Sequence, residues 1–197
     1  MFRLIKFSLF LFLVFYSSFS NAQGEGNIWY FGEFSGLDFL INNAGHSIRR
    51  SVMQSLDRLH DYERTINLNY LASVAVTLRS LPLMEQQHEG HVINISSIGV
   101  LSNSPRFSAY VASKAAVVGL TRAMAMELRD RQITVNSIAP GFTDTPMTRS
   151  APSEMFEAWS KLEPRGRGAD PAEIAGSVAY LISQEAGFIT GQCLFVD

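Results

Sequence analysis

The sequence predicts an α/β fold in which helices flank a parallel β-sheet. Residues 37–42 form an apolar stretch typical of a strand, a helical pattern begins near Asp61, and residues 91–96 form a second apolar run typical of a buried strand. The alternation of strand and helix then repeats, which is typical of parallel sheets joined by helical crossovers. The chain length suits a single domain with one core of ordinary size.

The predicted helices carry their own sequence signals. From Asp61 onward, apolar side chains step by three or four residues, the period of an α-helix, at Ile66, Tyr70, Val74, Leu78 and Leu81. A later helix is predicted to begin with Asp170 as its cap, Pro171 at its first position and Glu173 closing a capping box. Between the two, residues 147–167 suit either a mobile substrate lid or a short packed helix, and both interpretations stay open.

Four polar side chains carry the chemistry that the sequence indicates, and they are Asn67, Ser97, Tyr110 and Lys114. Ser97 lies thirteen residues before Tyr110, and Lys114 lies four residues after it. Residues four apart share one helix face, so the phenol and the ammonium can reach the same pocket. A nearby positive charge favours the phenolate, and we expect Lys114 to lower the pKa of Tyr110 below its reference of about 10. Such a phenol can pass a proton to a carbonyl oxygen as hydride arrives at the carbon, and Ser97, at a strand end, can hold the same oxygen.

Each of these residues has a simpler interpretation when taken alone. A tyrosine and a lysine four apart are usually a solvated pair on a helix. Ser96 and Ser97 are more often a turn signal at a strand end, and Asn67 is more often a helix residue that satisfies local backbone. The joint spacing of the four favours the catalytic interpretation.

Further motifs surround the four residues in order, at residues 40–45, 136–141 and 143–145. Together they resemble the short-chain dehydrogenase/reductase family over roughly residues 37–197. The resemblance implies a Rossmann-like parallel sheet and an NAD(P)(H)-dependent hydride transfer to or from a carbonyl or alcohol. It implies that Tyr110 is the acid/base, that Lys114 lowers the Tyr110 pKa and bonds the nicotinamide ribose, that Ser97 orients the substrate carbonyl, and that Asn67 supports a proton-relay water.

The resemblance also implies a cofactor site and a substrate class. Besides Tyr110 and Lys114, the residues implied to contact the cofactor are Asn43, Ala44, Gly45, Pro140, Gly141, Thr143 and Thr145. NADP or NAD would serve, with NADP slightly favoured by the family. Residues 46–65 look like fatty acyl-CoA reductases, and the chain from Gly119 onward looks like ketoacyl reductases, so an acyl-linked substrate is one option. In the family, the helices that would contain Asn67 and Tyr110 also form a subunit interface, and simple packing within one chain is the alternative.

The first 36 residues suggest a different origin from the rest. Arg3 and Lys6 precede an apolar run at residues 7–16, and small residues lie ahead of Gln23, so residues 1–22 are expected to be a secretory signal peptide. An uncleaved anchor is the minority alternative. Residues 26–32 resemble the mature start of secreted bacterial surface proteins, and we place a seam near residues 36–39 that marks a fusion, a misassembled reading frame or an artificial sequence.

The expected domain organisation follows from this seam. It comprises the signal peptide at 1–22, an unrelated segment at 23–36 and a partial dehydrogenase domain at 37–197, truncated at its N-terminus because no glycine-rich phosphate loop precedes residue 37. Strand 37–42 would then be an exposed edge unless residues 27–31 pair beside it. Export is expected if the signal peptide is real, and a cytoplasmic location is expected for the dehydrogenase part by family. A catalytically inactive domain that acts as a binding module or an exported surface fragment stays open as the alternative function.

Composition argues against several other classes of function. A net charge of −2 and a pI near 6.1 give no electrostatic footprint for nucleic acid. The single cysteine, Cys193, lies in an apolar terminal stretch and is expected to be a buried hydrophobe. The histidines show no metal-ligand spacing, and they are His46, His60, His88 and His91. We therefore expect neither a nucleic-acid partner nor a metal.

Overall fold

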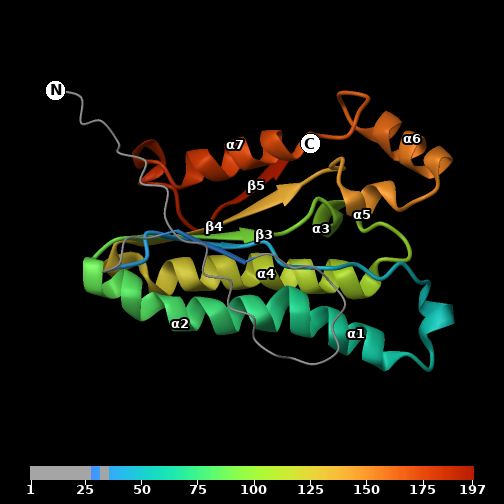
Figure 1. Cartoon of the computed structure of the whole chain (residues 1–197). Helices are drawn as coiled ribbons and strands as arrows, with labels where there is room; N and C mark the ends of the chain where they lie inside the picture. The colour runs from blue at the N-terminus through green and yellow to red at the C-terminus, as the bar shows by residue number, and fades with distance from the viewer. Residues whose placement is uncertain (1–27, 32–35) are drawn as a thin grey trace.

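The structure is a computed structural model that describes residues 28–31 and 36–197. The predicted signal peptide and its cleavage point before Gln23 lie outside the described residues. The strands are β1 (Ile28–Phe31), β2 (Phe39–Asn42), β3 (Gly90–Ile95), β4 (Ile133–Pro140) and β5 (Cys193–Val196). They form one sheet in the order β1-β2-β3-β4-β5 (Figure 1).

Strands β2 to β5 run parallel, which confirms the predicted α/β fold. β1 runs antiparallel to β2, with Ile28 opposite Asn42 and Phe31 opposite Phe39. The strand predicted at 37–42 is therefore paired on both sides, as the sequence allowed. On the far side of the sheet, β5 pairs with β4 from Ser137↔Cys193 to Pro140↔Val196.

The helices form a layer on each face of the sheet. Figure 1 shows α2 and α4 on one face and α7 on the other. The helices are α1 (Leu59–Ile66), a π-helical turn (Asn67–Leu71), α2 (Ala72–Gln87), α3 (Gly99–Ser102), α4 (Ser108–Glu127), α5 (Pro146–Arg149), α6 (Ser153–Leu162) and α7 (Pro171–Leu181). Short 3₁₀ turns occupy Val52–Ser55, Arg129–Arg131 and Gln184–Ala186. No helix in the described part of the chain is long and apolar enough to cross a membrane.

The core is divided by the sheet into two apolar clusters. The cluster on the α2 and α4 side comprises Leu37, Leu40, Met84, Val92, Met124, Ala125, Ile133 and Val135. On the α7 side, Ile93, Ile138 and Leu181 are buried together, and partly buried residues of α7 such as Ile174 and Val178 pack against them. The strands are therefore covered on both faces, as parallel sheets require.

The face that α1 and α2 turn toward the rest of the molecule is mostly polar, which differs from the apolar pattern that predicted the helix. Its buried residues are Asp61, Thr65, Asn69, Ser73, Thr77, Ser80 and Met84. The predicted apolar positions are only partly buried, and Leu78 is 56% exposed. Small hydroxyl residues are tolerated because they bond the preceding turn, as Thr77 Oγ1 does to the Ser73 carbonyl at 2.8 Å.

A chain of buried amides and hydroxyls links these helices to the sheet. Asn42 Nδ2 donates to Thr77 Oγ1 at 3.0 Å and to Asn94 Oδ1 at 2.8 Å, and Asn94 Nδ2 donates to Thr121 Oγ1 at 2.9 Å. The chain runs from α2 through β2 and β3 to α4. It fixes both helices relative to the strand ends, because buried polar groups need their partners.

Two predictions for the C-terminal third can be compared with the structure. The capping box of α7 is confirmed, since Asp170 accepts from the Ala172 N–H and Glu173 accepts from the Asp170 N–H, both at 2.8 Å. Residues 147–167 contain most of α5 and all of α6, so the segment predicted as either a substrate lid or a short packed helix is helical. We call α5, α6 and their connections, residues 146–162, the lid.

Candidate active site

The predicted catalytic side chains come from segments that meet at the carboxyl ends of β2, β3 and β4. Ser97 follows β3 by two residues, and Tyr110 and Lys114 lie in the first two turns of α4. Ligands of open parallel sheets bind at this edge. The structure therefore brings Ser97, Tyr110 and Lys114 together where the chemistry was predicted.

Tyr110 and Ser97 are the two hydroxyl side chains of the cluster. A hydrogen bond joins the two hydroxyl groups. Burial raises the pKa of Tyr110 above its usual value, and the bond with Ser97 acts in the opposite direction. Ser97 Oγ also accepts from the Gly99 N–H at 3.1 Å, which orients it at the start of α3. Tyr110 is therefore a neutral phenol that can donate a proton.

Lys114 is the most buried charged group of the cluster, with 4% of its surface exposed. Its Nζ donates to the Ile95 carbonyl at 2.7 Å and lies 5.9 Å from the centre of the Tyr110 ring. Burial lowers the pKa of Lys114 to about 8. The expectation of a Tyr110 pKa below its reference is wrong for this structure, because burial disfavours the charged phenolate and raises the pKa.

Asn67 is not part of this cluster, which corrects the sequence prediction. Its side chain is exposed at the start of the π-helical turn, whereas Asn69 is 1% exposed and points inward. Two positions along a helix lie on nearly opposite faces, so the two asparagines cannot both face the site. Asn67 and Asn69 are the same residue type within one helical turn, so sequence spacing alone could not show which of them faces the site.

Asn69 joins the loop after β2 to α4. Its Oδ1 accepts from the His46 N–H, and its Nδ2 donates to the His46 carbonyl and to Ser113 Oγ, all at 2.9 Å. Ser113 Oγ in turn donates to the Tyr110 carbonyl at 2.7 Å. Asn69 thus positions the turn of α4 that carries Tyr110.

Gly45 lets the loop after β2 approach this cluster closely. A Cβ atom on Gly45 would lie 3.2 Å from Asn69 Oδ1 and 3.3 Å from Lys114 Nζ. Such contacts are tighter than ordinary van der Waals packing, so a larger residue would displace one of the two side chains. The remaining residues predicted on this loop differ in exposure, since Asn43 is exposed and Ala44 is buried.

The cofactor residues predicted after β4 occupy a compact turn. Pro140 ends β4, and the Gly141 N–H donates to the Val196 carbonyl at 2.7 Å. Thr143 Oγ1 donates to the Gly141 carbonyl at 3.2 Å, and Thr145 caps α5 with its side chain. These four residues line the same strand-end edge as Ser97.

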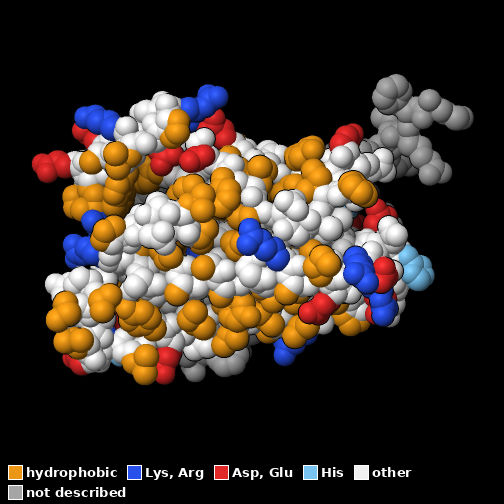
Figure 2. Space-filling model, turned by 180° about the vertical axis from the view of Figure 1, so that it is seen from behind, with side chains coloured by type: hydrophobic (Ala, Val, Ile, Leu, Met, Phe, Trp, Pro, Cys, Tyr) orange, Lys and Arg blue, Asp and Glu red, His pale blue; other side chains and the backbone are white. Residues whose placement is uncertain are grey.

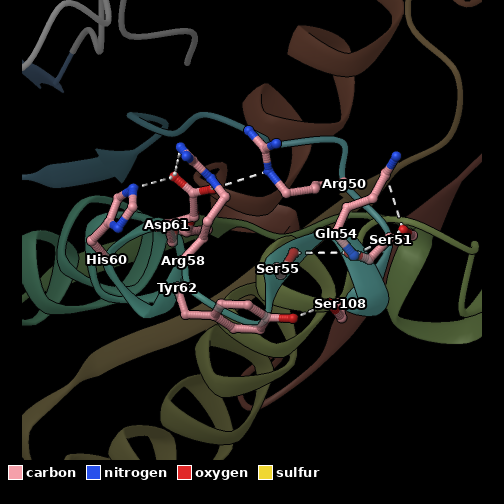
Figure 3. Close-up of polar contacts among 10 residues, drawn as sticks. Arg50, Ser51, Gln54, Ser55, Arg58, His60, Asp61, Tyr62 and Ser108 are labelled. Carbon is pink, nitrogen blue, oxygen red and sulfur yellow. Dashed lines mark hydrogen bonds and ion pairs between the residues drawn. The ribbon is translucent and has the colours of Figure 1, made fainter.

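A polar cluster missed by the sequence reasoning holds the loop that leads into α1 (Figure 3). Figure 3 shows Asp61 surrounded by Arg50, Arg58 and His60, and the ion-pair distances are 3.2, 2.8 and 3.3 Å. The hydrogen bond from Arg58 is the largest cause that holds the pKa of Asp61 below its usual value. Asp61 therefore anchors the segment between the loop after β2 and the π-helical turn that carries Asn69.

The lid packs on the turn after β4 through aromatic side chains. The ring centre of Phe142 lies 5.0 Å from that of Phe156 and 5.6 Å from that of Trp159. Arg149 forms a two-pronged ion pair with Asp144 at 2.5 Å and stacks over Phe156 at 5.3 Å. In the part of the chain that the structure describes, no group of three or more His, Cys, Asp or Glu side chains is placed to hold a metal.

Comparisons with known proteins agree with this geometry. A family model described as enoyl-(acyl carrier protein) reductase matches residues 30–197. The chain is 49% identical over 146 residues to a fatty acyl-CoA reductase of Acinetobacter baylyi, covering 74% of this chain and 46% of the relative. It is 36% identical over 165 residues to the 3-oxoacyl-[acyl-carrier-protein] reductase FabG of Thermotoga maritima, covering 84% of this chain and 66% of the relative.

A solved structure is similar over most of the fold. The angucycline C-6 ketoreductase LanV with bound NADP superimposes with a TM-score of 0.75 at 33% identity, covering 81% of this chain and 61% of LanV. The chain thus spans between about half and two thirds of the length of these relatives. Because the family match covers most of the chain and the parallel sheet gathers a serine, a tyrosine and a lysine at its carboxyl edge, the chain belongs to the short-chain dehydrogenase/reductase family.

Proposed function

We propose that this chain is an NAD(P)(H)-dependent oxidoreductase that transfers hydride to or from a carbonyl or alcohol. The observation that carries the proposal is the cluster of Ser97, Tyr110 and Lys114 at the strand ends. Asn69 positions this cluster through its hydrogen bond to Ser113. A neutral tyrosine with a raised pKa is suited to donate its proton to an oxygen on which negative charge develops. The function of an inactive binding module does not explain why these groups are gathered and oriented.

Each residue of the cluster has a distinct part in the proposed reaction. When bound, the nicotinamide supplies or accepts the hydride. Tyr110 donates its phenolic proton to the carbonyl oxygen in reduction and takes it back in oxidation. Ser97 holds the same oxygen, as its bond to the Tyr110 hydroxyl indicates. Lys114 stabilises the phenolate that Tyr110 becomes. Asn69, and not Asn67, is the asparagine that reaches the cluster, and it acts as a positioning residue.

The residues at the strand ends fit a nicotinamide cofactor. Lys114 Nζ has three N–H donors, and the structure gives it one acceptor, the Ile95 carbonyl, so further donors are free for ribose hydroxyls. Gly45 has no side chain that would fill the space beside that ammonium. The other cofactor contacts proposed are Asn43, Ala44, Pro140, Gly141, Thr143 and Thr145. NADP or NAD would serve, and NADP is favoured because LanV was solved with it.

The substrate is proposed to be an acyl-linked carbonyl compound. Two relatives support this, since one is named a fatty acyl-CoA reductase and the other a 3-oxoacyl-[acyl-carrier-protein] reductase. The aromatic side chains Phe142, Phe156 and Trp159 beneath the lid supply an apolar surface for such a compound.

A homo-oligomer through the helices that contain Asn67 and Tyr110 is also proposed. Leu71 in the π-helical turn, Leu78 in α2 and Met126 in α4 are 47%, 56% and 65% exposed. Figure 2 shows hydrophobic side chains along the lower part of the molecule, where α2 and α4 lie. Light scattering of the purified protein tests this, and a monomer mass at micromolar concentration would rule it out.

The proposals for the N-terminal segment are independent of the catalytic one. We propose export by a signal peptide at residues 1–22, and a division into segment 23–36 and a dehydrogenase domain at 37–197. The antiparallel direction of β1 against four parallel strands supports the division. N-terminal sequencing of exported protein tests the signal peptide, and mature chains that begin at Gln23 are the expected result.

Two measurements test the catalytic proposal. Excess NADPH or NADH is expected to raise the melting temperature of the full chain, because a ligand that binds only the folded state stabilises it. Oxidation of NADPH in the presence of acetoacetyl-CoA is expected for the native chain and not for Tyr110→Phe. If neither cofactor shifts the transition and no carbonyl compound is reduced, the proposal fails.

A further inference from the structure

The side chain of Arg49 reaches from the loop after β2 toward the lid. Its guanidinium carbon lies 5.3 Å from the centre of the Trp159 ring and 5.9 Å from that of Phe107, and its Nη1 contacts Met155 Sδ. Phe107 in turn packs edge-on against Tyr110, with ring centres 6.3 Å apart. Arg49 therefore lies two aromatic contacts from the catalytic tyrosine, between the lid and the helix that carries it.

Arg49 differs from three other arginines of this region in its charge partners. Arg50, Arg149 and Arg167 form ion pairs with Asp61, Asp144 and Glu173. Within the described residues, no carboxylate oxygen lies within ion-pair distance of Arg49, and its side chain is exposed. The guanidinium is thus held by aromatic rings and a sulfur atom, none of which neutralises its charge.

A guanidinium held in this way is prepared to bind an anion. Aromatic rings fix its position, and its N–H groups that no acceptor occupies stay free to donate. Phosphate and carboxylate match the paired N–H geometry of arginine, and the bonds they form are strengthened by charge. Because Arg49 lies away from Tyr110, an anion bound there would belong to a part of the substrate other than its reacting carbonyl.

We propose that Arg49 is a specificity-determining residue that binds the phosphate of a phosphopantetheine thioester. The inference rests on the proposed function, since it names the substrate class of that same site. Coenzyme A and acyl carrier proteins both present their acyl groups on an arm that bears this phosphate, and both occur in the names of the relatives. The acyl carbonyl would lie at Tyr110 and the phosphate at Arg49.

A kinetic comparison of three substrates with the same reacting carbonyl tests the inference. They are acetoacetyl-CoA, acetoacetyl-phosphopantetheine and acetoacetyl-N-acetylcysteamine, and the last has no phosphate. Arg49→Met keeps the apolar stem and removes the charge. We expect it to raise KM about tenfold for the two phosphorylated substrates, because charge-assisted bonds are lost, and to leave kcat and the KM of the cysteamine thioester within about twofold. Arg49→Lys is expected to fall between the native chain and Arg49→Met.

Two results would overturn the inference. An equal rise in KM for all three thioesters would show that Arg49 only holds the lid in place. A rise confined to acetoacetyl-CoA would place the contact on the phosphates of the nucleotide and not on the arm. The matched control is Arg129→Met, which removes an exposed arginine beyond the far end of α4, and no substrate is expected to respond to it.

A binding measurement keeps the inference separate from the catalytic proposal. The sequence has two tryptophans, so Trp29→Phe leaves Trp159, on which Arg49 stacks, as the single reporter. Titration with phosphopantetheine is expected to change its fluorescence, with about tenfold weaker binding in Arg49→Met and no saturable change with unphosphorylated pantetheine. Saturable binding without turnover would contradict the proposed function and support the phosphate site. Turnover together with identical binding of phosphopantetheine and pantetheine would support the proposed function and contradict the phosphate site.

Discussion

The floor of the site and the lid above it are built from different interactions. We call Ser97, Tyr110, Lys114 and the buried groups that position them the floor. Within it, Asn69, Ser113 and Lys114 are at most 4% exposed, and their polar atoms bond to backbone groups at 2.7–2.9 Å. The lid is attached by ring contacts and by arginines that are exposed to solvent. Buried, geometrically defined bonds suit groups that must stay in register with a reacting atom, and exposed contacts suit a surface that changes with the substrate.

The largest expected effect comes from the floor. Tyr110→Phe removes the proposed proton donor and keeps the ring that packs against Phe107, so turnover is expected to fall by about 10³-fold or more while the melting temperature changes little. Steady-state oxidation of NADPH with a carbonyl thioester measures the first quantity, and circular dichroism measures the second. Retention of more than a tenth of the activity would show that another group donates the proton.

A comparison of variants at Asn69 and Asn67 tests which asparagine positions the cluster. Asn69→Ala leaves the His46 backbone and Ser113 without their partner, and small displacements at a reacting centre reduce rates strongly. We expect kcat to fall about 100-fold in Asn69→Ala. Asn67→Ala, at an exposed side chain, is the matched control and is expected to keep kcat within about twofold. The reverse order would restore Asn67 as the site residue.

Lys114 makes stability depend on pH in a predictable direction. Its pKa is lowered from 10.5 to about 8 in the folded chain, so between these values the unfolded chain binds more protons and stability rises with pH. The raised pKa of Tyr110 reverses this trend above its ordinary value of 10.0. We expect the free energy of unfolding to gain about 2 kcal/mol from pH 8 to pH 10. Urea unfolding measures this, and an equal gain in Lys114→Met would refute the assignment.

The smallest effect is expected in the lid. Trp159→Ala removes the ring that stacks on Arg49 and packs against Phe142, yet the ring is partly exposed. We expect KM for an acyl thioester to rise a few-fold, kcat to hold, and unfolding to become easier by about 1 kcal/mol. A collapse of kcat comparable to that of Asn69→Ala would mean that the lid belongs to the catalytic floor.

The sequence predicted the parts of the molecule that depend on local pattern. Apolar runs located the parallel strands, the Asp170, Pro171 and Glu173 pattern located the start of α7, and the spacing of Ser97, Tyr110 and Lys114 located the cluster. The same local view selected Asn67, because which asparagine faces inward depends on how α1 and α2 pack. It also expected the wrong direction for the Tyr110 pKa, since burial is a property of the assembled fold.

Features that join distant segments could not be predicted in this way. Arg49 and Met155 lie 106 positions apart, and no periodicity links them. The buried face of α1 and α2 is polar because its hydroxyls bond their own helix and because Asn42 donates to Thr77 from a strand 35 positions away. Apolar spacing therefore found the helix without showing which of its faces is buried.

The proposed hydride transfer is tested most directly by following the hydride itself. The native chain would be incubated with a ketoacyl thioester and NADPH that carries deuterium at the hydride position of the nicotinamide, and the product would be analysed by mass spectrometry. We expect one deuterium on the new carbinol carbon, and we expect Tyr110→Phe to form almost none of this product. If the native chain binds NADPH and thioester yet yields no deuterated alcohol, the cluster at the strand ends does not perform hydride transfer.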